Sequence, residues 1–474
     1  MGGHGRADVV VVGAGSAGCV LAARLSEDTE RTVLLLEAGS ADPPTYRGPS
    51  FFDAIEEPGR TWPGLLARRV VGQEPRPYVR GRGLGGSSAV NAMIGLWGLP
   101  ADYDRWQSEH GCHGWGWADI GPVLQALPVP MRRTDRAAWG PVDTALVDAA
   151  AEIGWPSCAD HHRPGAWGAG PAWLTIGADG RRASAADVYL GAAQGRRNLA
   201  VRGEALVGEL LLDGRICRGV RLAGGEEVEA GEVVLAAGAI HSPAVLARSG
   251  VDRPGIGRGL EDHPSAAVAL VLRDRVDPHG LALATLGRFS SGVADADLQL
   301  LPMNHLGPAA PSLGLLALAL MRAHSRGRVV VADPDPRVEP VVELDMLSDE
   351  RDVEALTAGV AVVRRLLDTA PFRAAVSEAY LDDVGTPLDS LGSSADDVAA
   401  WLRARTGDYV HGSGTCRMGG RDDDAAVVDT GCRVIGYEGL RVCDASVLPE
   451  LPRANTHLTV VAVAELASRR WRAG

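Results

Sequence analysis

The sequence predicts an α/β protein that combines a dinucleotide-binding domain with a second, α+β lobe. The chain has 474 residues, more than the roughly 250–300 residues that one hydrophobic core organises. A strand, a glycine-rich turn and a helix follow one another at the N-terminus, and strand-like and helical stretches alternate between about residues 264 and 400. These observations predict two intimately joined lobes.

The N-terminal text predicts a βαβ unit. Four valines at 9–12 form a β-branched run that is typical of a buried parallel strand, and residues 13–18 follow it as a glycine turn. Residues 19–25 have helical composition, and residues 32–36 predict a second strand. The whole stretch has about the ~30 residues of such a unit.

The glycine turn has the spacing Gly13-x-Gly15-x-x-Gly18. The three glycines permit a tight turn, a close approach of a pyrophosphate to the backbone, and close packing of helix on strand. Glu37 lies 37 − 18 = 19 residues after Gly18, where an acid is expected to hydrogen-bond ribose hydroxyls and would repel the 2′-phosphate of NADP. The turn alone leaves FAD and NAD open. The residues expected at this site are Gly13, Gly15, Ser16, Ala17, Gly18, Glu37 and Ala38.

The remaining chain is less regular. We expect an extended loop over 40–80, a second glycine cluster over 81–88 and short helices within 101–195. The sequence of residues 198–238 again predicts strands, and an apolar helix is expected over 458–467.

Composition excludes several function classes. Lys+Arg is 47 and Asp+Glu is 60, so the net charge of −13 argues against non-specific nucleic-acid binding. Every basic residue is Arg, which excludes pyridoxal-phosphate, Schiff-base and Walker-type ATPase chemistry, because each needs a lysine. Seven widely spaced cysteines predict no disulfide framework and no structural zinc. With no transmembrane run and no signal peptide in the text, we predict a cytoplasmic protein.

Five blocks of the chain carry recognisable motifs. They are DVVVVGAGSAGCVLAARLSED with TVLLLEAG near the N-terminus, GRGLGGSSAVNAMIGLWGLPADYDRW (81–106), AAGAIHSPAVLARSGV (236–251) continued by GIGRGLEDHP (255–264), VHGSGTCRMG (410–419), and GLRVCDASVLPELPRANTHLTVVAVAELAS (439–468). In this order, the five blocks resemble those of the glucose–methanol–choline (GMC) oxidoreductase family. The resemblance implies a doubly wound, Rossmann-like FAD-binding domain with an interleaved α+β substrate domain that contains an antiparallel sheet. It also implies flavin-dependent oxidation of an alcohol to a carbonyl compound.

The resemblance divides the chain into five segments. The FAD-binding domain is expected to comprise residues 1–120 (with the flavin-contacting loop 81–106), 196–263 and 406–474. A cap segment of the substrate domain is expected over 121–195, and the rest of that domain over 264–405.

The resemblance also implies a catalytic pair, His411 and His457. The family places the first beside flavin N5, where hydride transfer from the alcohol carbon needs a base for the hydroxyl proton. We expect His411 to be the base and His457 to orient the oxygen, and the reverse assignment stays open. The helix that begins near Thr456 is expected to direct its N-terminus at the flavin pyrimidine ring.

Further cofactor contacts carried over from the family are Gly85, Gly86, Ser87, Asn91, Val207, Ala237, Asp444, Ala445 and Thr456. Some members attach FAD covalently through a His at the position that Val90 occupies here, so we predict non-covalent FAD. His241 and His263 are expected to be structural hydrogen-bond donors. Asp160, His161 and His162 lack a further ligand with suitable spacing, so no metal is predicted.

Other functions share these residues. A lyase would use the same pocket without net oxidation, and a non-catalytic flavin-binding protein would be favoured by loss of either histidine. The resemblance implies a small alcohol as substrate, and it leaves open whether oxygen, a quinone or another redox carrier is the electron acceptor. The compact substrate region and the arginine-only composition are similar to those of members associated with the redox peptide cofactor mycofactocin, which would make the reduced peptide the substrate and a respiratory carrier, not oxygen, the acceptor. Candidates for the pocket lining are Leu96, Trp97, Leu301, Met303 and His305.

Overall fold

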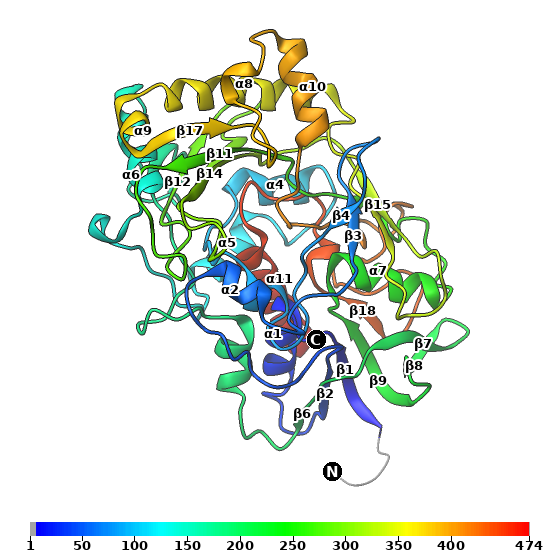
Figure 1. The fold of residues 1–474 in the computed structure, drawn as a ribbon. Helices are drawn as coiled ribbons and strands as arrows, with labels where there is room; N and C mark the ends of the chain where they lie inside the picture. The colour runs from blue at the N-terminus through cyan, green and yellow to red at the C-terminus, as the bar shows by residue number, and fades with distance from the viewer. Residues whose placement is uncertain (1–5, 474) are drawn as a thin grey trace.

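The computed structural model describes residues 6–473, whose strands form three sheets (Figure 1). The largest has the order β6-β2-β1-β9-β8-β7, with β18 also paired to β9. Strands β6, β2, β1, β9 and β18 run parallel, and β7 and β8 form an antiparallel hairpin beside β9. The bounds are β1 Ala7–Val12, β2 Val33–Leu36, β6 Leu199–Arg202, β7 Val207–Asp213, β8 Ile216–Leu222, β9 Glu227–Leu235 and β18 Leu440–Val442.

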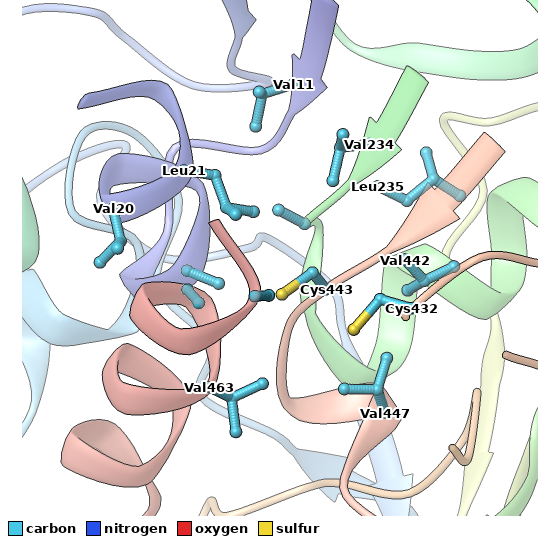
Figure 2. Packing of buried hydrophobic residues seen from close by; sticks show 14 of the residues in the cluster. Val11, Val20, Leu21, Val234, Leu235, Cys432, Val442, Cys443, Val447 and Val463 are labelled. Carbon is cyan, nitrogen blue, oxygen red and sulfur yellow. The ribbon is translucent and has the colours of Figure 1, made fainter. Parts of the chain in front are cut away.

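Helices α1 (Ser16–Leu25) and α11 (Thr456–Ala473) pack on each other beside this sheet. Figure 2 shows Leu21 of α1 and Val463 of α11 in one cluster with Val234 of β9 and with Cys443, which directly follows β18. The β-branched run of β1 is buried along Val9–Val12, as expected for a parallel strand that is covered on both faces. The core of this lobe therefore lies directly behind the glycine turn.

The second lobe is built on an antiparallel sheet with the order β17-β11-β14-β13-β12-β5 (Figure 1, upper part). Residues of β11 alternate between partly exposed and buried, which is the two-residue period of a strand. Its strands are β5 Gly168–Pro171, β11 Ser265–Leu272, β12 Thr285–Phe289, β13 Leu298–Met303, β14 Leu313–Leu320 and β17 Val376–Tyr380. The predicted α/β class with an antiparallel substrate-domain sheet is confirmed.

A smaller sheet, β10-β15-β16-β3-β4, draws on both lobes. Its strands are β3 Leu66–Arg68, β4 Arg76–Pro77, β10 Arg258–Leu260, β15 Gly327–Val330 and β16 Val341–Glu343. The prediction of an extended loop over 40–80 is wrong in part, because this segment also holds α2 (Phe51–Glu56). Ser50 caps α2 by accepting the Asp53 N–H at 3.2 Å, and β3 pairs with β16, a partner far along the chain.

The remaining helices surround these sheets. They are α3 Ser87–Val90, α4 Pro100–Ser108, α5 Trp117–Gln125, α6 Pro141–Glu152, α7 Gly238–Arg248, α8 Glu350–Leu367, α9 Ala370–Ala375 and α10 Ala395–Arg405, with short turns of other helix types at Arg136–Ala138, Ala186–Leu190, Leu388–Ser390 and Ala445–Val447. All seven cysteines are buried free thiols. Within residues 6–473, no helix combines the length and apolar character that a membrane span needs.

The strands of the seven-stranded sheet come from the three segments predicted for FAD binding, and those of the six-stranded sheet from the two substrate-domain segments. We propose the five-segment division on this basis.

Candidate active site

A cavity of about 470 Å³ is lined by residues of both lobes. Gly13 and Val207 line it from the side of the seven-stranded sheet, and Leu301 and Leu315 from the antiparallel sheet. Every predicted site residue lines this cavity except Gly18 and Gly85. The structure therefore brings together residues that are separated by more than 400 positions in the sequence.

The three glycines of the first turn play different parts. Gly13 has φ +98°, and a Cβ there would lie 2.7 Å from the Ala236 carbonyl oxygen. A Cβ at Gly18 would lie 1.8 Å from the carbonyl oxygen of Gly13, so Gly18 serves packing. At Gly15, which lines the cavity and caps α1, a Cβ would meet no atom within 4 Å. Open space in front of a helix N-terminus is what a phosphate group requires.

Glu37 is buried and joins the three loops around this end of the cavity. Its Oε2 accepts the Ala14 N–H at 2.7 Å, and its Oε1 accepts the N–H groups of Gly39 and Gly83 at 2.8 and 2.9 Å. A carboxylate offers about four acceptor sites, so these bonds leave capacity toward the cavity. The structure thus gives Glu37 a structural part in addition to the ribose contact that we propose.

The second glycine cluster packs on the first. Gly85 donates its N–H to the Ala14 carbonyl at 2.9 Å, and Gly86 has φ +49° with its Cβ position 2.7 Å from the Gly15 Cα. Gly85 therefore lies behind the cavity wall as a packing residue. Ser87 begins α3, and Asn91 follows α3 on the cavity wall.

Asp444 follows β18 and fixes the start of α7. Its carboxylate accepts the Gly238 N–H at 2.8 Å, the Ser242 hydroxyl at 2.6 Å and the Ser446 N–H at 2.7 Å. Burial raises the pKa of this carboxyl group. Ala237 and Ala445 lie beside it on the cavity wall.

His457 lies in the first turn of α11, next to Thr456, which begins the helix. Its Nδ1 is 3.0 Å from the Ser16 hydroxyl, so the last helix contacts the first glycine turn. Its Nε2 is buried and has no partner among residues 6–473. Burial lowers the pKa of His457 to about 4, so its ring is neutral at pH 7.

His411 is held by its backbone. Its N–H donates to Asp262 Oδ1 at 3.0 Å, and the Tyr78 hydroxyl donates to Asp262 Oδ2 at 2.7 Å. The preceding residue, Val410, has φ +55°, a strained conformation for a β-branched side chain, and the Arg80 guanidinium donates to its carbonyl. Burial, and next to it the neighbouring His263 ring and the Arg80 guanidinium, hold the pKa of His411 well below its usual range.

Asp262 and Asn455 were missed from the sequence as residues of this site, and His263 was expected only as a structural hydrogen-bond donor. Asn455 Nδ2 lies 3.3 Å from His411 Nε2, and His263 Nδ1 lies 2.9 Å from His411 Nδ1. Asp262 and His263 lie inside the quoted block 255–264, and Asn455 stands two residues before His457, so the signal was their place in blocks already singled out.

Two of the five pocket candidates line the cavity, Leu301 and Met303. In the part of the chain that the structure describes, Leu96, Trp97 and His305 lie outside its lining. Trp97 instead stacks on His162 with ring centroids 3.5 Å apart.

Together, a βαβ glycine turn, a buried acid after the second strand and two neutral imidazoles in one cavity define a dinucleotide-dependent oxidoreductase. The family models for the N- and C-terminal parts of GMC oxidoreductases match residues 7–265 and 323–464. The chain belongs to the GMC oxidoreductase family.

Similar proteins agree with this assignment. The chain is 36% identical to a 5-(hydroxymethyl)furfural oxidase of Methylovorus sp. (strain MP688), with 97% of each chain covered. It is 31% identical to an oxygen-dependent choline dehydrogenase of Klebsiella pneumoniae, over 97% of this chain and 94% of the other. The crystal structure of pyridoxine 4-oxidase from Mesorbium loti superposes with a TM-score of 0.89 at 29% identity, over 99% of this chain and 100% of the other.

The predicted FAD cofactor is confirmed at the level of the family. The residues present fit it: Gly15 leaves open space at the α1 N-terminus, and the buried Nε2 of His457 has no partner among the described residues. The glycine turn, Glu37 and the second glycine cluster would hold the dinucleotide.

Proposed function

We propose that this chain oxidises an uncharged, largely apolar alcohol at FAD, with His411 as the base, His457 as the orienting group and oxygen as the electron acceptor. When bound, FAD supplies the two-electron acceptor for the hydride of the alcohol carbon. The observation that supports the proposal most is that two neutral imidazoles line one cavity with the glycine turn. Oxygen is proposed because relatives at 36% and 29% identity bear the names of oxidases.

The roles of the two histidines follow from their partners. An alcohol hydroxyl has a pKa far above 7, so its proton needs a positioned acceptor. His411 is neutral, and the amide N–H group of Asn455 faces its Nε2. This nitrogen therefore carries no proton and can accept one, as a base must. His457 contacts Ser16 through Nδ1 and keeps Nε2 free, so it can hydrogen-bond the substrate oxygen and hold the alcohol in a reactive orientation.

The proposal of an uncharged substrate comes from the far end of the cavity. The side chains there are mostly apolar, with Tyr409 beside them: Ile94, Leu283, Leu301, Met303, Leu315 and Ala317. Among the described lining residues the carboxylates are Glu37, Asp408 and Asp444. Asp408 forms an ion pair with Arg69, with Nε–Oδ2 at 2.6 Å, and the other two accept several hydrogen bonds each. A quaternary ammonium group would find no unpaired anion, and burying it would be costly.

The test is anaerobic mixing of the FAD-loaded protein with two alcohols of equal shape, choline and 3,3-dimethylbutan-1-ol, and with benzyl alcohol as an aromatic example. We expect the uncharged alcohols to bleach the flavin at least about tenfold faster than choline, since an unpaired buried charge costs more than ~1.4 kcal/mol. Faster reduction by choline would refute the substrate class. No bleaching by any alcohol, with product formed from a lyase substrate, would refute oxidation. Reoxidation by air rather than by a quinone or another respiratory carrier tests the acceptor.

A further inference from the structure

His411, one of the two predicted catalytic histidines, is hydrogen-bonded to His263, a histidine outside that pair. His411 Nδ1 and His263 Nδ1 lie 2.9 Å apart, with the ring planes perpendicular. His263 is completely buried, and burial lowers its pKa to about 3, so it is neutral. At this distance one of the two nitrogens must carry the proton and the other must accept it.

The neighbouring amide decides which nitrogen is the donor. Asn455 Nδ2, which has only N–H groups to offer, faces His411 Nε2 at 3.3 Å. Nε2 is therefore an acceptor, and the single proton of neutral His411 sits on Nδ1. It follows that Nδ1 of His263 accepts this proton, and that His263 carries its own proton on Nε2. The carbonyls of Met321 and Pro452 lie near that ring without closing a hydrogen bond to Nε2.

We propose that His263 is a positioning residue whose Nδ1 lone pair fixes the His411 tautomer in which Nε2 carries no proton and can accept the substrate proton. This inference rests on the proposed function. As the alcohol O–H bond breaks, its proton goes to His411 Nε2, and the imidazolium donates its Nδ1 proton to His263 in a hydrogen bond. His263 gains no net proton. A neutral acceptor at this position stabilises the His411 imidazolium. A buried carboxylate there would stabilise the imidazolium so strongly that His411 would stay protonated.

Other groups around His411 do not offer an acceptor to Nδ1. Asp262 accepts the backbone N–H of His411, and the Tyr78 hydroxyl faces Asp262. Burial, and next to it the charge of Asp408, raise the pKa of Asp262. Arg80 contributes positive charge near His411, and Tyr409 presents its ring edge-on with the ring centroids 5.1 Å apart.

Two substitutions separate this role from simple packing. In His263→Asn, the side-chain oxygen can take the place of Nδ1 as an acceptor; in His263→Phe, no acceptor remains. We expect anaerobic flavin reduction to stay within about threefold of wild type for Asn and to fall about 10- to 100-fold for Phe, the range for a hydrogen bond to a charged group. With the acceptor gone, the His411 imidazolium is less stable, so the acid limb of kcat/KM moves to lower pH in the Phe variant. The matched control is His161→Asn, which removes a buried histidine that contacts Cys158 outside the cavity.

A Phe variant with wild-type rates and pH limb, or an Asn variant as slow as Phe, would overturn the inference. If His263→Phe does not load FAD, His263→Gln, whose amide reaches the Nε2 position and leaves the Nδ1 position empty, takes its place. The proposed function fails separately: it is contradicted if His411→Asn reduces flavin at the wild-type rate, whatever the result at His263.

Discussion

Replacing Gly15 with Ala should weaken FAD binding while leaving the stability of the apoprotein almost unchanged. Gly15 has φ −77° and ψ −164°, which Ala adopts freely, and its added methyl group meets no protein atom within 4 Å. Loss of chain entropy in the unfolded state would stabilise the apoprotein by about 0.4–1 kcal/mol, and the poorer helix cap would cost a similar amount. The stability of the apoprotein should therefore change by less than about 1 kcal/mol.

The same methyl group would project into the space that we assign to the pyrophosphate. Displacing a charge-assisted hydrogen bond costs about 1.5–3 kcal/mol, which corresponds to a Kd for FAD about 10- to 150-fold weaker. The assay is fluorescence titration of the apoprotein with FAD, together with urea unfolding. Gly13→Ala is the contrasting control: with φ +98° and a Cβ 2.7 Å from the Ala236 oxygen, it should destabilise the apoprotein by at least about 1–2 kcal/mol. Unchanged FAD affinity in Gly15→Ala would refute the assignment of this space.

Two further predictions concern His457 and Val90. The pKa of His457 is about 4 in the folded state against ~6.5 unfolded, so the unfolded state binds the proton first and stability falls as the pH drops from above 6.5 toward 4. The His457→Asn variant should lose about 3 kcal/mol less unfolding free energy than the wild type between pH 7 and pH 4. Urea unfolding of both proteins at the two pH values measures this difference. Equal losses in the two proteins would contradict the burial of a neutral ring. With valine at position 90, acid precipitation should release all yellow colour into the supernatant, and colour kept in the pellet would show a covalent link.

Local patterns predicted the nucleotide end of the site. The turn Gly13-x-Gly15-x-x-Gly18 and the acid at Glu37 act within one βαβ unit, so their spacing in the sequence is also their arrangement in space. The segment 313–320, LGLLALAL, was not predicted as a strand, because most of its residues are buried and its apolar text lacks the alternation that marks a half-exposed strand.

The hydrogen-bond partners of His411 could not be predicted, because they come from distant segments. His263 is 148 residues away, and the contact of Tyr78 with Asp262 spans 184 residues. Such pairs form only when the segment between β10 and β11 lies beside the segment of His411, as the bridge between Glu261 and Ser413 shows. His411 and His457 were predicted as site residues from the family resemblance. Their protonation states could be inferred only from the three-dimensional structure.

The most direct measurement is anaerobic stopped-flow reduction of the FAD-loaded protein and its His411→Asn variant by the best alcohol of the panel. A base in the transition state contributes about 10²- to 10⁴-fold, so the variant should lose that factor in the rate of flavin bleaching while its FAD content and visible spectrum stay unchanged. Bleaching of the variant at the wild-type rate would contradict the assignment of His411 as the group that accepts the hydroxyl proton.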